Sequence, residues 1–111
     1  MRSLTPPVYH ILLALADGER HGYAIMQDVA SQTNGRLQMG PGTLYGCLKR
    51  MLTAGLVEET DERPDPEIDD ERRRYYRMTR LGRESLRTET QRLTDALAAA
   101  KNKRVLAGGR A

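Results

Sequence analysis

One short segment of the sequence, residues 40–53, has residue types and a spacing suited to contact with a nucleic acid. Pro41 fits the first turn of a helix, where a residue needs no backbone N–H. At 3.6 residues per turn, one side of that helix begins with small residues and ends with cations: Gly42, Thr43, Gly46, Lys49 and Arg50. Each glycine costs a helix about 1 kcal/mol, so keeping two of them favours close approach of a partner to the backbone. A DNA groove is such a partner, and the alternative is a solvated helix face.

The opposite side of the same helix is apolar and must pack against the rest of the protein. It carries Leu44, Cys47, Leu48, Met51 and Leu52, with Tyr45 on the flank. Cys47 is expected to be a small buried hydrophobic residue, because free cysteine is among the most buried residue types. The alternative is an oxidation switch, which needs an exposed thiolate. The helical angles of Lys49 and Arg50 are expected to point them away from Cys47, which favours the buried role.

Three helices are predicted before residue 56. Thr5 can cap the first helix, which has two prolines in its opening turn. That helix is apolar on nearly every side over residues 8–16, a pattern typical of burial from more than one direction. The second helix is predicted over about residues 21–33, and the third is the helix of residues 41–53. Each is followed by a glycine that ends it: Gly18, Gly35 and Gly55.

A two-stranded hairpin and a long helix are predicted to follow. Residues 56–60 and 72–78 are expected to form antiparallel strands, with an acidic, mobile turn at residues 58–71. Thr79 can cap the last helix, which extends to about residue 100. Its least polar positions repeat at alternating spacings of four and three, as in a short coiled-coil seam: Leu86, Thr90, Leu93, Leu97 and Ala100. The alternative is a helix folded back on its own core.

These elements predict an α+β chain, mainly α with a small β-hairpin. Three helices, a hairpin and a long helix, in that order, are the elements of a winged helix-turn-helix with a C-terminal dimerisation helix. In such a fold the third helix enters the major groove, and the hairpin lies along the backbone or the minor groove. We expect a DNA-binding unit at residues 1–78, a dimerisation helix at 79–104 and a disordered tail at 105–111. With 111 residues and neither Phe nor Trp, the core is small, which favours stabilisation by dimerisation.

Charge is divided sharply along the chain. Of its 15 acidic and 18 basic residues, nine acids and one base, Arg63, lie in residues 58–71, which therefore have a net charge of −8. The other residues hold 17 bases and six acids and have a net charge of +11. A body this basic suits a polyanion such as nucleic acid, and the alternative is a surface charged only for solubility.

Other chemistries find little support in the sequence. His10, His21 and Cys47 are too few and wrongly spaced for a zinc site. No catalytic triad, phosphate-binding glycine loop or dinucleotide fingerprint is present, so we expect neither an enzyme nor a cofactor. The rival function is that of a winged-helix module that binds a protein through the acidic turn. One cysteine, no apolar run of membrane length and no signal-peptide pattern predict a cytoplasmic protein without membrane contact.

Several motifs stand in order over residues 8–95. They are His21-Gly22-Tyr23, Gly42-Thr43-Leu44-Tyr45, Leu48-Lys49-Arg50-Met51, Gly55-Leu56-Val57 and Arg74-Tyr75-Tyr76-Arg77-Met78-Thr79-Arg80-Leu81-Gly82. With them the chain resembles the PadR family of bacterial transcriptional regulators, and its short last helix is similar to that of the small PadR subfamily. Gly46 departs from the pattern, since a proline often follows the tyrosine. The resemblance implies a homodimer that binds an inverted-repeat operator in double-stranded DNA, usually as a repressor and often under control of a small-molecule effector.

Site residues follow from their places in the expected fold. Those expected at DNA are His21, Tyr23, Gly42, Thr43, Tyr45, Gly46, Lys49, Arg50, Arg72, Arg73 and Arg74. The hydroxyl of Tyr45 and the amine of Lys49 are suited to phosphate contacts, and the wing arginines to a narrow groove. His21 and Tyr23 begin the second helix, whose free N–H groups favour an anion. The dimer interface is expected to bury Val8, Ile11, Leu12, Leu15, Leu86, Leu93 and Leu97 across a two-fold axis.

Overall fold

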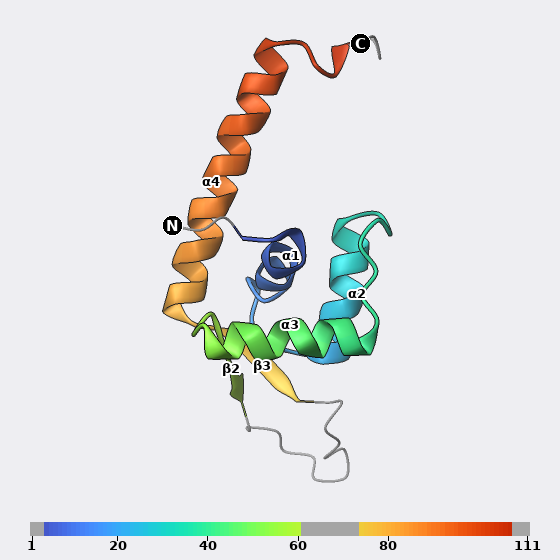
Figure 1. Ribbon diagram of the computed structural model, residues 1–111, viewed down its shortest axis with the longest axis vertical. Coiled ribbons are helices and arrows are strands. Elements are labelled where there is room, and N and C mark those ends of the chain that lie inside the picture. The colour runs from blue at the N-terminus through green and yellow to red at the C-terminus, as the bar shows by residue number, and fades with distance from the viewer. Residues whose placement is uncertain (1–3, 61–73, 108–111) are drawn as a thin grey trace.

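The computed structural model describes residues 4–60 and 74–107, which form four helices and three short strands. In chain order these are α1 (Pro6–Ala14), β1 (Arg20–His21), α2 (Gly22–Gln32), α3 (Pro41–Thr53), β2 (Val57–Thr60), β3 (Tyr75–Met78) and α4 (Arg80–Asn102). Figure 1 shows α1 between α4 and α2, with α3 crossing the lower end of the body. The predicted winged helix-turn-helix of the α+β class is confirmed.

Local signals fix the ends of these helices. The Thr5 hydroxyl accepts a hydrogen bond from the Val8 N–H at 3.5 Å, and the Thr79 hydroxyl accepts one from the Gly82 N–H at 3.0 Å. Both helix starts predicted from the sequence are thereby confirmed. At the end of α3, Gly55 has a φ of 79°, which lets the Leu56 N–H reach back to the Met51 carbonyl at 2.9 Å. This Schellman motif directs the chain from α3 into β2.

The sheet has three antiparallel strands in the order β1-β3-β2. Val57 pairs with Met78 and Thr60 with Tyr75, as expected for the predicted hairpin. The β1 strand was not predicted: it is only two residues long, and it pairs His21 with Tyr75 on the other edge of β3. Tyr76 is buried while Arg77 is exposed, so β3 presents one face to the core.

The core gathers around α1. Its largest fully buried side chains come from α1, α2 and α3 and from the turn after α1: Ile11, Leu12, Leu15, Ile25, Val29, Leu44, Leu48 and Met51. Ile11, Leu12 and Leu15, which we had predicted at the dimer interface, are 1% exposed or less within the protomer itself. Apolar character predicted their burial correctly, but it does not specify which element covers them. Val8 is half-buried at the margin of the core.

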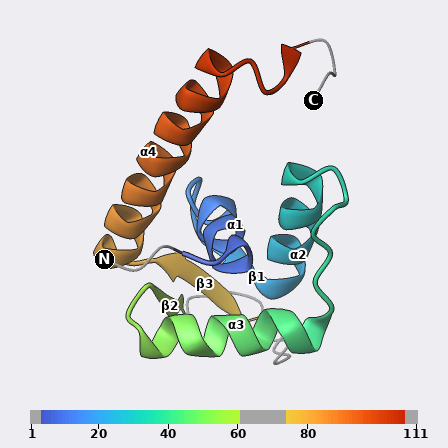
Figure 2. The same cartoon turned by 45° about the horizontal axis from the view of Figure 1, so that its top comes forward.

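The two halves of α4 have different environments. The first half packs on the body and buries Gly82, Ser85, Leu86 and Glu89, so Leu86 also belongs to the protomer core rather than to a free interface. Every residue from Gln91 to Ala99 is exposed. In Figures 1 and 2 this half projects past α1 and α2, and the molecule measures 55 Å along its longest axis. In the described part of the chain, no helix combines the length and the apolar character that a membrane span requires.

The chain turns at the end of α4 instead of becoming disordered at residue 105 as expected. Arg104 has a φ of 58°, and the Val105 N–H donates to the Ala100 carbonyl at 3.1 Å. This is again a Schellman arrangement, here with arginine in the left-handed position. The described chain continues to Ala107, and residues 108–111 of the expected tail lie outside the described residues.

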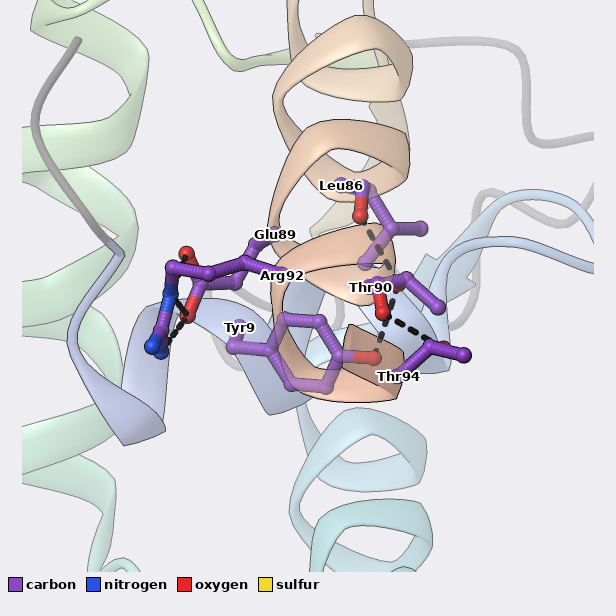
Figure 3. Close-up of polar contacts among 6 residues, drawn as sticks. All are labelled: Tyr9, Leu86, Glu89, Thr90, Arg92 and Thr94. Carbon is purple, nitrogen blue, oxygen red and sulfur yellow. Dashed lines mark hydrogen bonds and ion pairs between the residues drawn. The ribbon is translucent and has the colours of Figure 1, made fainter. Parts of the chain in front are cut away.

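Polar contacts attach the N-terminal region to α4 (Figure 3). The Thr90 hydroxyl donates to the Leu86 carbonyl at 2.8 Å, so the Tyr9 hydroxyl, 2.9 Å away, is the donor to Thr90. Glu89, whose exposed fraction is only 5%, forms an ion pair with Arg92. The Glu89 carboxylate also accepts a hydrogen bond from the Leu4 backbone. These contacts hold α1 and the chain before it against the base of the projecting helix.

The Glu89 contacts predict a defined pH dependence. The hydrogen bond from Arg92 lowers the pKa of the Glu89 carboxyl, with a smaller contribution from Leu4, while burial acts in the opposite direction. Because the folded pKa lies below the unfolded value of about 4.3, the resulting stability is fully present above that value and is lost as pH falls through the folded pKa. Glu89→Gln should therefore lower stability at pH 7 and flatten its decline in acid.

Urea unfolding of wild type and Glu89→Gln at several pH values between 7 and the acid limit measures this effect. Glu84→Gln is the matched control, because Glu84 is exposed and its oxygen lies 3.6 Å from Arg80 on the same helix. An exposed pair of this kind contributes little. If Glu89→Gln and wild type lost stability in parallel on acidification, Glu89 would not be the titrating group.

Candidate nucleic-acid interface

The structure divides α3 into the two sides that the sequence predicts. Leu44, Cys47, Leu48 and Met51 are buried against the body, and Leu52 is half-buried. The outer side carries Gly42, Thr43, Lys49 and Arg50, all exposed, with Gly46 partly exposed. A Cβ added at Gly42 would meet no atom within 4 Å. The start of α3 therefore exposes its backbone at Gly42, so a binding partner can approach the helix closely there.

The cations on α3 are available for a polyanion. In the described part of the chain, no carboxylate lies within ion-pair distance of Lys49 or Arg50. The arginines of the β-hairpin differ, because Arg74 contacts Glu59 at 3.2 Å and Arg77 contacts Glu58 at 2.6 Å. The two other wing arginines of our prediction, Arg72 and Arg73, lie outside the described residues.

Tyr45 connects α3 to the start of α2. Its side chain is half-buried, as predicted for the ring, and its hydroxyl lies directly against the backbone of Gly22. A Cβ at Gly22 would meet both the hydroxyl and the ring of Tyr45 at 3.0 Å or less. Gly22 thus lets Tyr45 of α3 pack closely on the start of α2. The sequence analysis did not predict this role, although Gly22 stands in the motif His21-Gly22-Tyr23. The contact sets how the two helices of the helix-turn-helix lie together.

The start of α2 places aromatic rings next to the wing. His21 caps α2, since its Nδ1 accepts the Ala24 N–H at 3.1 Å. Its ring meets that of Tyr75 edge-on at 5.4 Å and lies nearly parallel to that of Tyr23 at 6.5 Å. One of the helix N–H groups that we assigned to an anion is therefore occupied by His21 itself. Tyr23 remains 58% exposed and is the outermost aromatic residue of this cluster.

Tyr76 anchors the hairpin beneath the two helices. Burial, with a smaller contribution from the Glu59 carboxylate, raises the pKa of Tyr76 to about 12. The phenol is protonated at neutral pH, as an unshifted tyrosine would be, and the raised pKa keeps it neutral further into the alkaline range. Among the described residues, no cluster of three or more His, Cys, Asp or Glu side chains is arranged to hold a metal ion.

The Arg50 side chain points in a different direction from the one that the sequence predicted. Its Nη2 donates to the Cys47 sulfur at 3.4 Å, whereas the helical angles of the two residues had suggested that they point apart. The reason is the length of the side chain: arginine at one position of a helix reaches the residue three positions earlier. Cys47 itself is buried, as expected, with an exposed fraction of 4%.

Known proteins are similar to this chain in sequence or in fold. The chain is 40% identical over 79 residues to an uncharacterized 37.1 kDa protein in a transposon of Streptomyces fradiae. The match covers 71% of this chain but only 20% of that protein, so the chain spans a fifth of this relative's length.

Two solved structures have the same fold. A PadR family transcription regulator from Clostridium difficile matches with a TM-score of 0.66 and 22% identity, over 88% of this chain and 97% of that one. Bacillus subtilis PadR, solved in complex with operator DNA, matches with a TM-score of 0.61 and 21% identity, over 73% of this chain and 44% of that one. The sequence also matches the transcriptional regulator PadR-like family over residues 11–88. The winged helix-turn-helix and this match together place the chain in the PadR-like family of transcriptional regulators.

Proposed function

We propose that this protein binds double-stranded DNA through α3 and regulates transcription as a binding protein rather than as an enzyme. The observation that carries the proposal is the outer side of α3, where Lys49 and Arg50 lack carboxylate partners among the described residues and where Gly42 exposes the backbone. Phosphates attract such cations, and a helix whose first turn carries only small side chains fits closely into a major groove. The complex of Bacillus subtilis PadR with operator DNA supports this assignment, because the two proteins share a fold.

The active form is proposed to be a homodimer on an inverted repeat. The second half of α4 exposes Leu93 and Leu97, which lie one helical turn apart and are 40% and 48% exposed. A projecting helix without tertiary contacts is marginal in water, so these leucines favour a second copy of α4 as partner. A two-fold axis between the copies would pair two α3 helices with two half-sites, as an inverted repeat requires, and a dimer bound there would act as a repressor of transcription.

A small-molecule effector is proposed to act at the same subunit contact. Tyr9, which contacts α4 at Thr90, and the exposed Leu93 and Leu97 one and two turns further along α4 supply apolar surface for such a ligand. A ligand held there would change the spacing of the two α3 helices, and only a ligand that prefers one dimer geometry shifts the affinity for DNA.

Salt dependence tests the DNA face. Lys49→Ala should weaken binding to every DNA sequence and reduce the slope of log K against log salt by about one for each contact removed. Thr43→Ala should reduce the preference for the operator more than the total affinity, because a base-edge contact carries sequence information. Fluorescence anisotropy with labelled duplexes over a salt series measures both effects.

Lys101→Ala is the matched control, because the substitution removes the same charge from an exposed position near the far end of α4. It should keep the wild-type slope. If wild type bound no DNA even at low salt, the DNA-binding proposal would fail. The alternative, a module that binds a protein through the acidic segment 58–71, would then be preferred.

A further inference from the structure

The Arg50 side chain lies folded back along α3. Its Nη2 donates to the Cys47 sulfur at 3.4 Å, and its Nη1 is 3.7 Å from where a Cβ of residue 46 would be. The guanidinium therefore lies at van der Waals distance from the helix surface at Gly46. Because helical side chains lean toward the N-terminus, the Arg50 cation lies over the middle of α3, on the side toward Gly42.

The acceptor in this contact is buried. Cys47 is 4% exposed and belongs to the buried side of α3, together with Leu44, Leu48 and Met51. A sulfur acceptor gives only a weak hydrogen bond, but no carboxylate of the described residues competes for Arg50. One of the five N–H donors of the guanidinium is thereby used, and the others remain for a ligand.

We propose that Arg50 reads a guanine in each operator half-site and that Cys47 is the residue that positions it. This rests on the DNA binding proposed above. The planar fork of arginine matches the O6 and N7 acceptors of guanine in the major groove, which is the commonest base-specific contact in protein–DNA complexes. The hydrogen bond to Cys47 restricts the orientation of the guanidinium before DNA binds. The Arg50 side chain therefore loses less conformational entropy when it binds the guanine.

The experiment starts from sequences selected by the wild-type chain out of a random duplex pool. Each selected guanine is then replaced by adenine in turn. The affinity for each duplex is measured for wild type, Arg50→Lys, Cys47→Ala and Cys47→Ser. Wild type should prefer guanine at one position per half-site by about 5- to 150-fold. Arg50→Lys should lose that preference while keeping the wild-type salt slope, because lysine retains the charge but lacks the fork.

Cys47 variants separate positioning from packing. Cys47→Ala should fold yet reduce the guanine preference by about 2- to 3-fold, the lower end of the effect of one lost hydrogen bond, because sulfur is a weak acceptor. Cys47→Ser keeps an acceptor and should restore the preference, even if its melting temperature is as low as that of Cys47→Ala.

The inference is overturned if Arg50→Lys retains the preference, or if Cys47→Ala and Cys47→Ser both match wild type at every guanine. Loss of the preference in both cysteine variants, in step with their stability, would also overturn the positioning role. Wild-type protein that binds duplexes without any guanine requirement defeats this inference alone. Wild-type protein that binds no duplex defeats the proposed function.

Discussion

Replacing Gly82 with alanine is expected to lower the free energy of unfolding by about 3 kcal/mol or more. Gly82 is buried in the first turn of α4, next to Leu56, which connects α3 to β2. A Cβ at this position would lie far inside contact distance of the Leu56 carbonyl oxygen and 2.9 Å from the Met78 side chain. Leu56 is held by its own backbone bonds to Met51 and Thr79, so the clash cannot be relieved by a rotamer change.

Denaturant unfolding followed by circular dichroism measures this loss. Gly42→Ala is the control, since a Cβ there meets nothing within 4 Å. It should leave stability unchanged or raise it by up to about 1 kcal/mol, because alanine is the better helix former. Equal unfolding midpoints for Gly82→Ala and wild type would mean that α4 does not approach the Leu56 carbonyl as described.

Leu93→Asp should convert the proposed dimer to a folded monomer and weaken binding to an inverted repeat by about 100-fold or more. Leu93 is 40% exposed in the protomer, so the substitution removes no core packing there. In a dimer it would bury an unpaired carboxylate in the α4 seam, which is strongly unfavourable. Without the partner, each half-site is bound alone and the gain from two linked contacts is lost.

Sedimentation velocity at micromolar concentration and operator titration together measure this effect. Leu81→Asp is the matched control on the same helix, because Leu81 is 46% exposed and its place in the first turn tolerates an acid. It should remain dimeric. Wild-type protein that sediments as a monomer would exclude the seam as a stable interface.

Local signals explain why most elements were predictable. Thr5, Thr79 and Gly55 act on the backbone within a few residues of themselves, so the sequence alone indicates where α1 and α4 begin and α3 ends. The two-sided pattern of α3 is likewise a property of one helix. It predicted both the buried Cys47 and the exposed Lys49.

Features that depend on distant partners were not predictable. The β1 strand exists because His21 pairs with Tyr75, and two residues carry no strand pattern of their own. The apolar side chains of α1 signalled burial, but only the packing shows that Ile11 is covered by its own protomer. Gly22 and Gly82 look like ordinary helix residues until Tyr45 and Leu56 are placed against them.

The central place of β3 has a consequence for how this protein can change. Because β3 is paired with β1 on one edge and β2 on the other, strand pairing alone keeps Tyr76 in the core and Arg77 beside Glu58. Each edge of β3 thus has its own set of backbone hydrogen bonds. A substitution that weakens the pairing of β2 therefore leaves β3 attached to β1, and one that weakens β1 leaves it attached to β2.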